Sequence, residues 1–588
     1  MTAVAHREVE RKYEMPEGAE DRVDWNGLGA FTVSTEPVEH RLEAVYHDTP
    51  DMALGRRLVA LRRRRGGADE GWHVKFQGAD GRHEVHVPLL RTPDRMPAAV
   101  RNLLAGLTRG EELRPIATLR TVRRVRTVRD GTGAEVAEIA VDVVEAVDER
   151  TGTARSWSEW EVELLDGTVP DEQQGQVFSA VEAVVLAAGG RRSASRAKIA
   201  RALGEEDEGA SAGSGAEGQR ASADEATGTS RQELLAEPGK KPGKKPGKKS
   251  GKTQRKAQEK QQQEKQEKQA QEPGKKKQGK KGGKKQGQRS EPDVLRAVLG
   301  ELAQQLVLWD LQVRLDVPDA VHQMRVTSRS LRSVLKAAAP FFDGDAAEEL
   351  DARLRELARS LSAARDAEVA ADLLPGRVAE LDGRVGPAAA EHLQGTAEEQ
   401  ARTAAGKVRR HVVTQEHLRL LADVEDFAAA PPVTEDCARR SGREVSDALV
   451  HRALQKVIRV AERGAEAEPG GGTSAAPQLE HLHDVRKAVK RVRYVDAVLD
   501  RTGLRPGKRL RRAARDAEDY QDALGRIMDA AVVERWLART ATSLERSTAD
   551  RYAVGLLHGA EVVRLRTGVE GGADVVGVLL SQLREDLA

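Results

Sequence analysis

The sequence contains a single cysteine, Cys437, in 588 residues. One thiol excludes an intramolecular disulfide framework and any metal site built from several cysteines. Aromatic residues make up only 3% of the chain, so a hydrophobic core must be built mainly from Leu, Val and Ala. No apolar run approaches the roughly 20 residues that a membrane-spanning helix needs, and the N-terminus lacks an apolar signal segment. These absences predict a cytoplasmic protein with no membrane partner.

Charged residues are abundant, at 32% of the chain, yet they nearly cancel to a net charge of +2. Residues 240–289 break this balance with 18 lysines, two arginines and four glutamates, a local net charge of +16. Because this tract has almost nothing apolar to bury, we expect residues 204–290 to form a disordered linker rich in Lys, Gly, Pro and Gln. The basic tract would act either as a solvated spacer or as an electrostatic trap for a polyanion.

Length predicts more than one domain, because 588 residues are too many for a single core. The linker divides the chain into an N-terminal domain, 1–203, and a C-terminal domain, 291–588. Short alternating runs bounded by Gly, Pro and Asp predict an α+β, mostly antiparallel β fold with about eight strands, enough to close a barrel. These runs are 7–13, 42–47, 59–65, 71–77, 83–89, 117–128, 136–147 and 156–164.

Charged side chains alternate along these strands where apolar side chains would normally face a core. Strand periodicity places Glu8, Glu10 and Lys12 on one face, and it groups the carboxylates of the run 156–164 in the same way. Arginines recur along the run 59–65. If these faces point inward, they line a charged lumen, which needs ligand, water or ion partners. The alternative is a set of solvated strand faces with surface ion pairs.

The residue types fit a hard divalent cation beside a polyanion. Carboxylate ligands without cysteine favour Mg²⁺ over Zn²⁺ and leave Mn²⁺ as an alternative. A triphosphate repels an incoming hydroxide, so Arg and Lys must neutralise it, while a divalent cation can bridge phosphoryl oxygens and activate water. The pattern therefore predicts metal-dependent chemistry on a phosphoanhydride.

The Glu-x-Glu-x-Lys opening at residues 8–12, the Tyr-His-Asp-Thr-Pro segment 46–50 and the arginine-rich strand 61–64 resemble the CYTH family of triphosphate tunnel metalloenzymes. The resemblance spans nearly the whole N-terminal domain. It implies an eight-stranded antiparallel tunnel that hydrolyses a triphosphate with Mg²⁺ or Mn²⁺. Members of the family act on inorganic tripolyphosphate, thiamine triphosphate, RNA 5′ ends or, in class IV adenylyl cyclases, ATP.

The resemblance and the strand pattern assign roles to residues of this chain. The expected catalytic residues are Glu8, Glu10 and Lys12. The expected metal ligands are Glu8, Glu10, Glu161, Glu163 and Asp142. The expected phosphate-binding residues are Lys12, Arg62, Arg64, Lys75, Arg120, Arg124, Arg126 and Lys198. Two departures from the family stand out: Lys198 is separated from Ser195 where the family has a closing Ser-Lys segment, and His86 replaces a glutamate that many members carry.

The C-terminal domain is predicted to be helical and internally repeated. One basic set is matched by a second at identical spacing, which indicates two related halves. The two sets are His322, Arg325, Arg329 and Arg332, and His483, Arg486, Lys490 and Arg493. At about 100° per residue, each set falls within roughly a quarter-turn, opposite an apolar face. We therefore expect each helix to pack with one face and to present a basic stripe on the other.

These helices resemble the CHAD domain, and Arg365-Asp366 and Leu524-Gly525 with Asp529 also fit its repeated pattern. The resemblance implies a helical bundle with a basic central surface that binds inorganic polyphosphate, in a domain often fused to a CYTH domain. We expect both basic sets to bind polyphosphate rather than a metal, because neighbouring cations would repel a metal ion. The alternative is a solvated basic face on which the histidines are packing residues.

Three functions are compatible with this sequence. The first is a metal-dependent inorganic triphosphatase or short-chain polyphosphatase whose helical domain binds polyphosphate. The second is a non-catalytic polyphosphate-binding or granule-associated protein. The third is an adenylyl cyclase or RNA 5′-triphosphatase, ranked lowest because aromatic platforms for bases are few. Nucleic acid is not expected as a specific partner, although the basic linker would bind it non-specifically.

Overall fold

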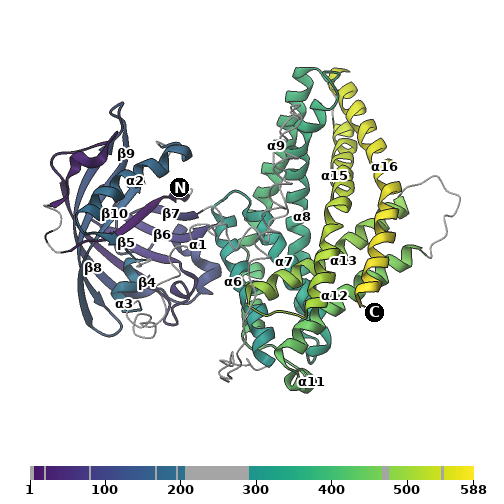
Figure 1. The fold of residues 1–588 in the computed structure, drawn as a ribbon, viewed down its shortest axis with the longest axis horizontal. Helices are drawn as coiled ribbons and strands as arrows, with labels where there is room; N and C mark the ends of the chain where they lie inside the picture. The colour runs from purple at the N-terminus through teal and green to yellow at the C-terminus, as the bar shows by residue number, and fades with distance from the viewer. Residues whose placement is uncertain are drawn as a thin grey trace, which may run out of the picture.

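A computed structural model describes residues 5–16, 18, 22–78, 81–165, 169–193, 197–205, 291–465, 476–543 and 548–587. Residues 206–290, which make up nearly all of the predicted linker 204–290, lie outside the described residues. The described chain forms a mostly β N-terminal domain beside an all-α C-terminal domain (Figure 1), which confirms the predicted fold class. None of the helices in the described part of the chain is long and apolar enough to span a membrane.

One curved antiparallel sheet builds the N-terminal domain. Its strands are β1 (Ala5–Glu8), β2 (Glu10–Glu14), β3 (Thr32–Val33), β4 (Val38–Asp48), β5 (Ala60–Arg65), β6 (Gly71–Gly78), β7 (Gly81–Pro88), β8 (Arg114–Arg129), β9 (Glu135–Asp148), β10 (Thr153–Leu164) and β11 (Arg191–Arg192). Their order along the sheet is β1-β7-β6-β5-β4-β8-β9-β10-β2-β11, and β3 pairs with β8. All eight predicted strands are present, the first of them divided at Val9 into β1 and β2.

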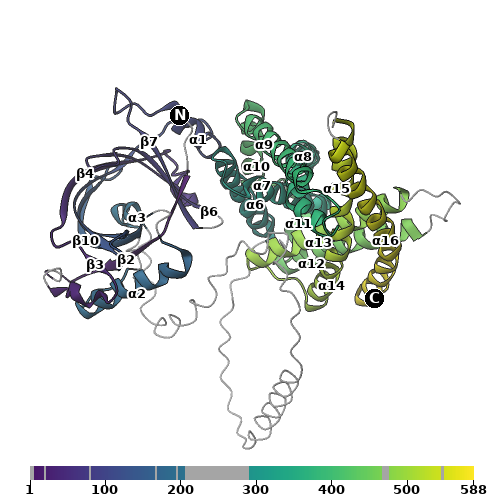
Figure 2. The same ribbon diagram turned by 90° about the horizontal axis from the view of Figure 1, so that it is seen from above.

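The division at Val9 shapes the sheet into a tunnel. β1 pairs with β7 at one end of the sheet, whereas β2 pairs with β10 near the other end. Because Val9 alone separates β1 from β2, one short segment serves both ends and the sheet curves around α3 (Lys198–Leu203), as Figure 2 shows.

The pleat of the strands separates charged from apolar side chains. In β5, Leu61 faces outward and is 1% exposed, while Arg62 lines the lumen. The neighbouring strand β6 repeats this division, with Val74 outside and Lys75 inside. The apolar side chains of these strands thus form the hydrophobic core on the outer face, and the charged side chains line the lumen.

Part of the lumen is apolar, and α3 fills it. Ala202 and Leu203 of α3 pack against Leu119, Val144 and Trp157 of the surrounding strands. The segment that carries Lys198 is thereby anchored inside the tunnel, and the charged part of the lumen ends at this apolar plug.

Two helices cover the outer face of the sheet. α2 (Asp171–Ala187) places Phe178 and Val181 in one core with Trp160 of β10. α1 (Ala98–Thr108) shares a second core with Trp72 and Val74 of β6, and this core continues into the helical domain.

The C-terminal domain is a helical bundle with an internal repeat, as predicted. Its helices are α6 (Glu291–Arg314), α7 (Ala320–Ala338), α8 (Ala346–Ala379), α9 (Pro387–Val412), α10 (Gln415–Ala429), α11 (Glu435–Arg439), α12 (Gly442–Ala465), α13 (Ala476–Arg501), α14 (Lys508–Asp519), α15 (Gln521–Ser543) and α16 (Thr548–Leu587). The pair α12 and α13 repeats the pair α6 and α7, and α7 packs against α13. The two helices that carry the basic sets are thus neighbours.

Candidate functional site

A cavity of about 330 Å³ lies in the tunnel. Its carboxylates are Glu8, Asp69, Glu84, Glu138, Glu161 and Glu163, and its cationic side chains are Lys12, Arg62, Arg64, Lys75, Arg82, Arg123 and Lys198. Tyr46 supplies the one phenyl or indole ring among the described residues that line it. The lumen is therefore charged with both signs, as the strand alternation indicated.

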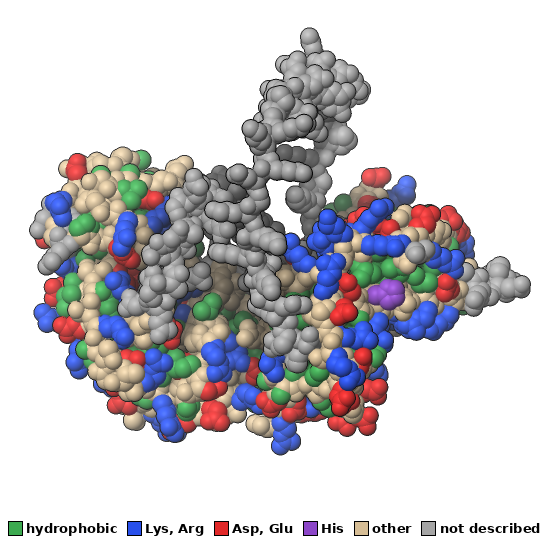
Figure 3. All heavy atoms as spheres, turned by 60° about the horizontal axis from the view of Figure 1, so that its bottom comes forward, with side chains coloured by type: hydrophobic (Ala, Val, Ile, Leu, Met, Phe, Trp, Pro, Cys, Tyr) green, Lys and Arg blue, Asp and Glu red, His purple; other side chains and the backbone are tan. Residues whose placement is uncertain are grey.

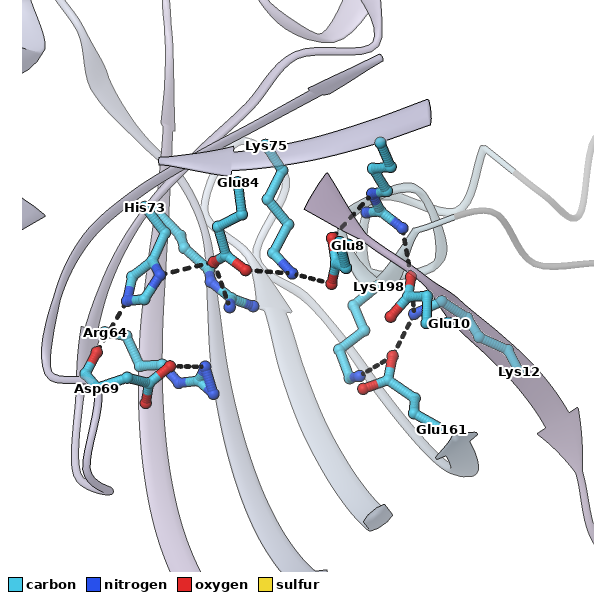
Figure 4. Close-up of polar contacts among 12 residues, drawn as sticks. Glu8, Glu10, Lys12, Arg64, Asp69, His73, Lys75, Glu84, Glu161 and Lys198 are labelled. Carbon is cyan, nitrogen blue, oxygen red and sulfur yellow. Dashed lines mark hydrogen bonds and ion pairs between the residues drawn. The ribbon is translucent and has the colours of Figure 1, made fainter. Parts of the chain in front are cut away.

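The N-terminal carboxylates are paired with cations from β6 and β7, and Figure 4 shows Lys75 of β6 between Glu84 and Glu8. Lys75 Nζ lies 2.6 Å from Glu8 Oε1 and 3.0 Å from Glu84 Oε2. Arg82 forms ion pairs with Glu8 and with Glu10. Burial would raise the pKa of the Glu8 carboxyl, but Lys75 and Arg82 lower it below its usual value. The Glu8 side chain is therefore held as a carboxylate.

A second charged cluster surrounds Lys198. Its Nζ lies 3.0 Å from Asp142 Oδ2 and 2.7 Å from an oxygen of Glu159 and of Glu161. Arg123 adds ion pairs to Asp142 and Glu161, at 2.7 and 2.6 Å. Burial would lower the pKa of Lys198, but the carboxylates raise it. The three carboxylates lie close enough together to hold a metal ion, yet an ammonium already lies among them, and it would repel a divalent cation.

Glu163 is a lumen carboxylate whose negative charge is poorly balanced by its neighbours. It lies directly opposite Glu10 in the pairing of β10 with β2, so both side chains face the lumen. Within the described residues Glu163 forms no ion pair, and burial together with the nearby carboxylates of Glu8 and Glu10 raises its pKa to about 7. A divalent cation would supply the missing positive charge. The ligand atoms of Asp142, Glu159 and Glu161 lie within 4.8 Å of one another, whereas Glu8, Glu10 and Glu163 form no such close group among the described residues. A metal ion shared by Glu8, Glu10 and Glu163 would therefore have to draw these carboxylates together.

A third group lies on β5, β6 and β7. His73 Nδ1 lies 2.6 Å from Glu84 Oε1, and Arg62 Nη2 lies 3.4 Å from the same oxygen. Arg64 pairs with Asp69 at 2.7 Å. Burial would raise the pKa of Glu84, but His73, Lys75 and Arg62 lower it far below its usual value. Glu84 thus orients the cations of this wall.

In the helical domain, the basic sets of α7 and α13 converge on Tyr494. The side chains of Arg325, Lys490 and Arg493 are buried, and the Arg493 guanidinium lies 5.2 Å from the centre of the Tyr494 ring. Burial would raise the pKa of the Tyr494 hydroxyl, but Lys490, Arg329, Arg493 and Arg325 lower it to about 8. Cations from both helices therefore act on one buried hydroxyl.

These buried cations lack partners at several atoms. The Nε atoms of Arg325, Arg486 and Arg493 have no hydrogen-bond partner among the described residues. Burial and the neighbouring Arg329 lower the pKa of Arg325 to about 10, since a further positive charge is unfavourable there. Buried donors without acceptors cost free energy, which a bound anion would recover.

The comparisons with known proteins agree with this geometry. The CYTH domain family matches residues 6–183, and the CHAD domain family matches residues 297–538. The chain is a CYTH–CHAD fusion. Two uncharacterized proteins of Mycobacterium tuberculosis, from strains CDC 1551 and H37Rv, are each 27% identical over 577 residues, which cover 95% of this chain and 93% of theirs.

Solved structures resemble the domains separately. PptA from Streptomyces chartreusis is 19% identical and covers 50% of this chain and 100% of its own, with a TM-score of 0.38. The CHAD domain from the plant Ricinus communis is 21% identical over 48% of this chain and 92% of its own, with a TM-score of 0.37. A Hippeastrum protein described as a putative adenylyl cyclase with dominant triphosphatase activity is 19% identical over 34% of this chain and 96% of its own, with a TM-score of 0.23.

The predicted inward face of β8 in the CYTH domain is wrong. Arg123 lines the lumen, so Arg120, Arg124 and Arg126, each an odd number of residues away, lie on the outer face. The Arg120 side chain is 70% exposed, and Arg126 donates to backbone carbonyls of the segment before β4. Arg123 lies opposite Asp142 in the pairing of β8 with β9. That cross-strand acid was the signal that could have identified the inward arginine.

Other CYTH side chains belong to the site without an assignment from the sequence. Arg82 lies two residues before Glu84, on the same strand face, and Glu159 lies two residues before Glu161. Period-two spacing could have identified both. His86, which replaces a family glutamate, lies against His73 with ring centroids 4.8 Å apart.

The basic stripes of the CHAD domain do not form a solvated face, which was the alternative interpretation. Because α7 packs against α13, the stripes are enclosed between helices, and the His322 side chain is 3% exposed. Burial lowers the pKa of His322 and of His483 to about 4, so both are neutral at neutral pH. Arg332 is set apart from the rest of its stripe, because it pairs with Asp351 of α8 at 2.9 Å.

The surface visible in Figure 3 carries charges of both signs. On the face shown in Figure 3, Lys and Arg are interspersed with Asp and Glu over both domains.

Proposed function

We propose that the protein is cytoplasmic and hydrolyses inorganic tripolyphosphate or short-chain polyphosphate in the CYTH tunnel, with Mg²⁺ or Mn²⁺. Its CHAD domain would bind polyphosphate. The poorly balanced negative charge of Glu163 is the observation that carries the proposal. Glu163 is a lumen carboxylate that faces Glu10, and its pKa is raised by burial and by the nearby carboxylates of Glu8 and Glu10. Such a lumen is arranged for a ligand that brings both a divalent cation and a polyanion.

Hydrolysis transfers the terminal phosphoryl group to water and releases pyrophosphate. Lys75, Arg62 and Arg123 would bind phosphate oxygens by exchanging their present carboxylate partners for the substrate. Glu8, Glu10 and Glu163 would hold the metal ion. When bound, the ion would neutralise charge on the phosphoryl group and help to activate water.

The apolar plug formed by α3 favours a substrate that enters from one side. Lys198 lies at the boundary of this plug and the charged cavity, where it would bind the deepest phosphate. The described lining contains a single phenyl ring, that of Tyr46, and therefore offers little stacking surface for a nucleobase. This composition supports an inorganic substrate over ATP or an RNA 5′ end.

In the CHAD domain, we propose that Arg325, Arg329, Arg486, Lys490 and Arg493 bind a polyphosphate chain. The donors without partners at Arg325, Arg486 and Arg493 support this role. His322 and His483 would serve as neutral hydrogen-bond donors. Arg332 would contribute less, because Asp351 already binds it.

Substrate discrimination tests the proposal. The purified protein should release phosphate from tripolyphosphate with Mg²⁺ or Mn²⁺ and form no cyclic nucleotide from ATP. Tight polyphosphate binding without turnover under either metal would instead establish the non-catalytic, granule-associated alternative. Cyclic AMP as the main product would establish a cyclase.

A further inference from the structure

Helix α1 carries the contact between the CYTH and CHAD domains. In Figure 2 it lies between the tunnel and α6. Arg314 Nη1 of α6 donates to the carbonyl of Asn102 in α1 at 3.0 Å. Leu103, Leu104 and Leu107 of α1 belong to one hydrophobic core with side chains of β6, α6 and α10. The core therefore runs without interruption from the outer wall of the tunnel into the helical bundle.

Gly106 sets how closely α1 approaches the CHAD domain. A Cβ atom at this position would lie 2.5 Å from Asp310 Oδ2 and 3.1 Å from Leu421 Cδ1. Asp310 is held by Arg314 at 2.7 Å and by His417 at 2.9 Å, so its carboxylate cannot readily move. The fit between the domains therefore depends on the absence of a side chain at Gly106.

Two ion pairs between the domains flank this apolar contact. Arg57, which follows β4, pairs with Glu425 of α10, and these side chains are only 9% and 11% exposed. Arg109 Nη2, at the end of α1, lies 2.7 Å from Asp426 Oδ2. Both arginines come from the CYTH domain and both acids come from α10. The arrangement combines an apolar centre, a buried ion pair and a fixed orientation, as stable interfaces do.

We propose that this surface, the α1 joint, is a permanent docking site that holds the CHAD domain on the CYTH domain without help from residues 206–290. The joint is defined by Arg57, Leu103, Gly106, Leu107 and Arg109 on one side and by Asp310, Arg314, Leu421, Glu425 and Asp426 on the other. The proposal does not depend on which anion either domain binds.

The joint also bears on the tunnel wall. Val74 of β6 packs in the core that α1 shares with the CHAD domain, and the next residue, Lys75, lines the lumen. The helical domain therefore braces, from outside, the strands whose inner faces carry the phosphate-binding cations.

Cutting the full-length chain between its two domains tests whether the α1 joint alone holds them together. A recognition sequence for a site-specific protease is inserted between residues 240 and 250, and the chain is cut completely. We expect the two fragments to elute together on size-exclusion chromatography, at the position of the uncut protein. Separate elution of the two folded fragments would overturn the proposal.

Two glycine variants of the cleavable chain locate the contact. Gly106→Leu should weaken the association of the cut fragments at least tenfold, because the new side chain meets Asp310 and Leu421. Gly175→Leu on α2, where an added Cβ meets nothing within 4 Å, should leave it unchanged. Equal behaviour of the two variants would overturn the assignment of the joint to α1.

A charge swap gives a second measurement that does not rely on steric overlap. Arg57→Glu alone and Glu425→Arg alone should each release the fragments after cleavage, and the double variant should restore their association. Circular dichroism of the uncut chains verifies the fold. Release in neither single variant, or no recovery in the double variant, would contradict a specific docking surface.

Discussion

Arg123 and Glu161 form an ion pair on the inner wall of the tunnel, with Arg123 Nη2 2.6 Å from Glu161 Oε2. Arg123 comes from β8 and Glu161 from β10, and Asp142 of the intervening strand accepts two further hydrogen bonds from the same guanidinium. The next residue along the chain, Arg124, lies on the other side of the sheet. Adjacent arginines thus provide a matched pair that separates the lumen from the outer surface.

Arg123→Gln is expected to lower kcat/KM for tripolyphosphate about 100-fold or more, since it removes a preorganised positive charge from the lumen. Arg124→Gln should change it by no more than about twofold, because a substitution on the outer face leaves that charge in place. Phosphate release under steady-state conditions provides the measurement. Equal losses in the two variants would mean that the arginines act through the fold rather than through the lumen.

Glu163→Gln should weaken binding of Mg²⁺ or Mn²⁺ at least about tenfold, because it removes a carboxylate whose negative charge its neighbours balance poorly. Isothermal titration with metal, in the absence of substrate, measures the change directly. Glu145→Gln, on the outer face of β9, is the control and should bind metal as the wild type does. Unchanged affinity in Glu163→Gln would place the ion elsewhere, with the cluster around Lys198 as the next candidate.

Arg325→Gln combined with Arg486→Gln should lower the affinity for long-chain polyphosphate by roughly tenfold for each charge, since each removes a charge-assisted hydrogen-bond donor. The dependence of binding on salt should also become shallower. Turnover of tripolyphosphate in the tunnel should not change. Arg439→Gln, at a 70% exposed side chain of the same domain, is the control. Polyphosphate affinity that is equal in all of these proteins would refute the site between α7 and α13.

Tyr494 offers a spectroscopic reporter of the same site. Its pKa of about 8 lies below the value near ~10 of an unfolded tyrosine, so folding favours the ionised form. The resulting stabilisation is complete above the unfolded pKa and is lost as the pH falls through about 8. Bound polyphosphate neutralises the cations that lower this pKa and should raise it.

Ultraviolet difference spectra of tyrosinate, recorded during a pH titration, test the role of Tyr494. The free protein should show a transition near pH 8 that is absent in Tyr494→Phe, and saturating polyphosphate should move it to higher pH. A transition that polyphosphate does not move would show that the anion binds away from Tyr494.

Sequence periodicity predicted the tunnel because strand alternation is local. Glu8 begins a run whose charged residues recur at every second position, and Lys75 alternates with the buried Val74 and Phe76, and the structure brings the two charges together. The face of β8 could not be found in the same way, since arginines occur on both of its faces. The pairing of Arg123 with Asp142 decides which face is inside, and that pairing depends on strand register rather than on local pattern.

In the CHAD domain, helical spacing located the basic sets but not their environment. A basic stripe opposite an apolar stripe usually faces water, yet Arg325 and Arg493 are buried because α7 and α13 pack together. The α1 joint could not be predicted from the sequence either. Gly106 and Asp310 are separated by about 200 residues of sequence, and no local pattern relates two surfaces that meet only in the folded chain.

Metal-dependent hydrolysis in the CYTH tunnel can be tested in a single assay. Tripolyphosphate is incubated with the wild type and with a Glu8→Gln, Glu10→Gln double variant, with Mg²⁺, with Mn²⁺ and without metal, and released phosphate is measured. Turnover should require metal and should disappear in the folded variant. Metal-independent turnover, or full activity in the variant, would contradict it.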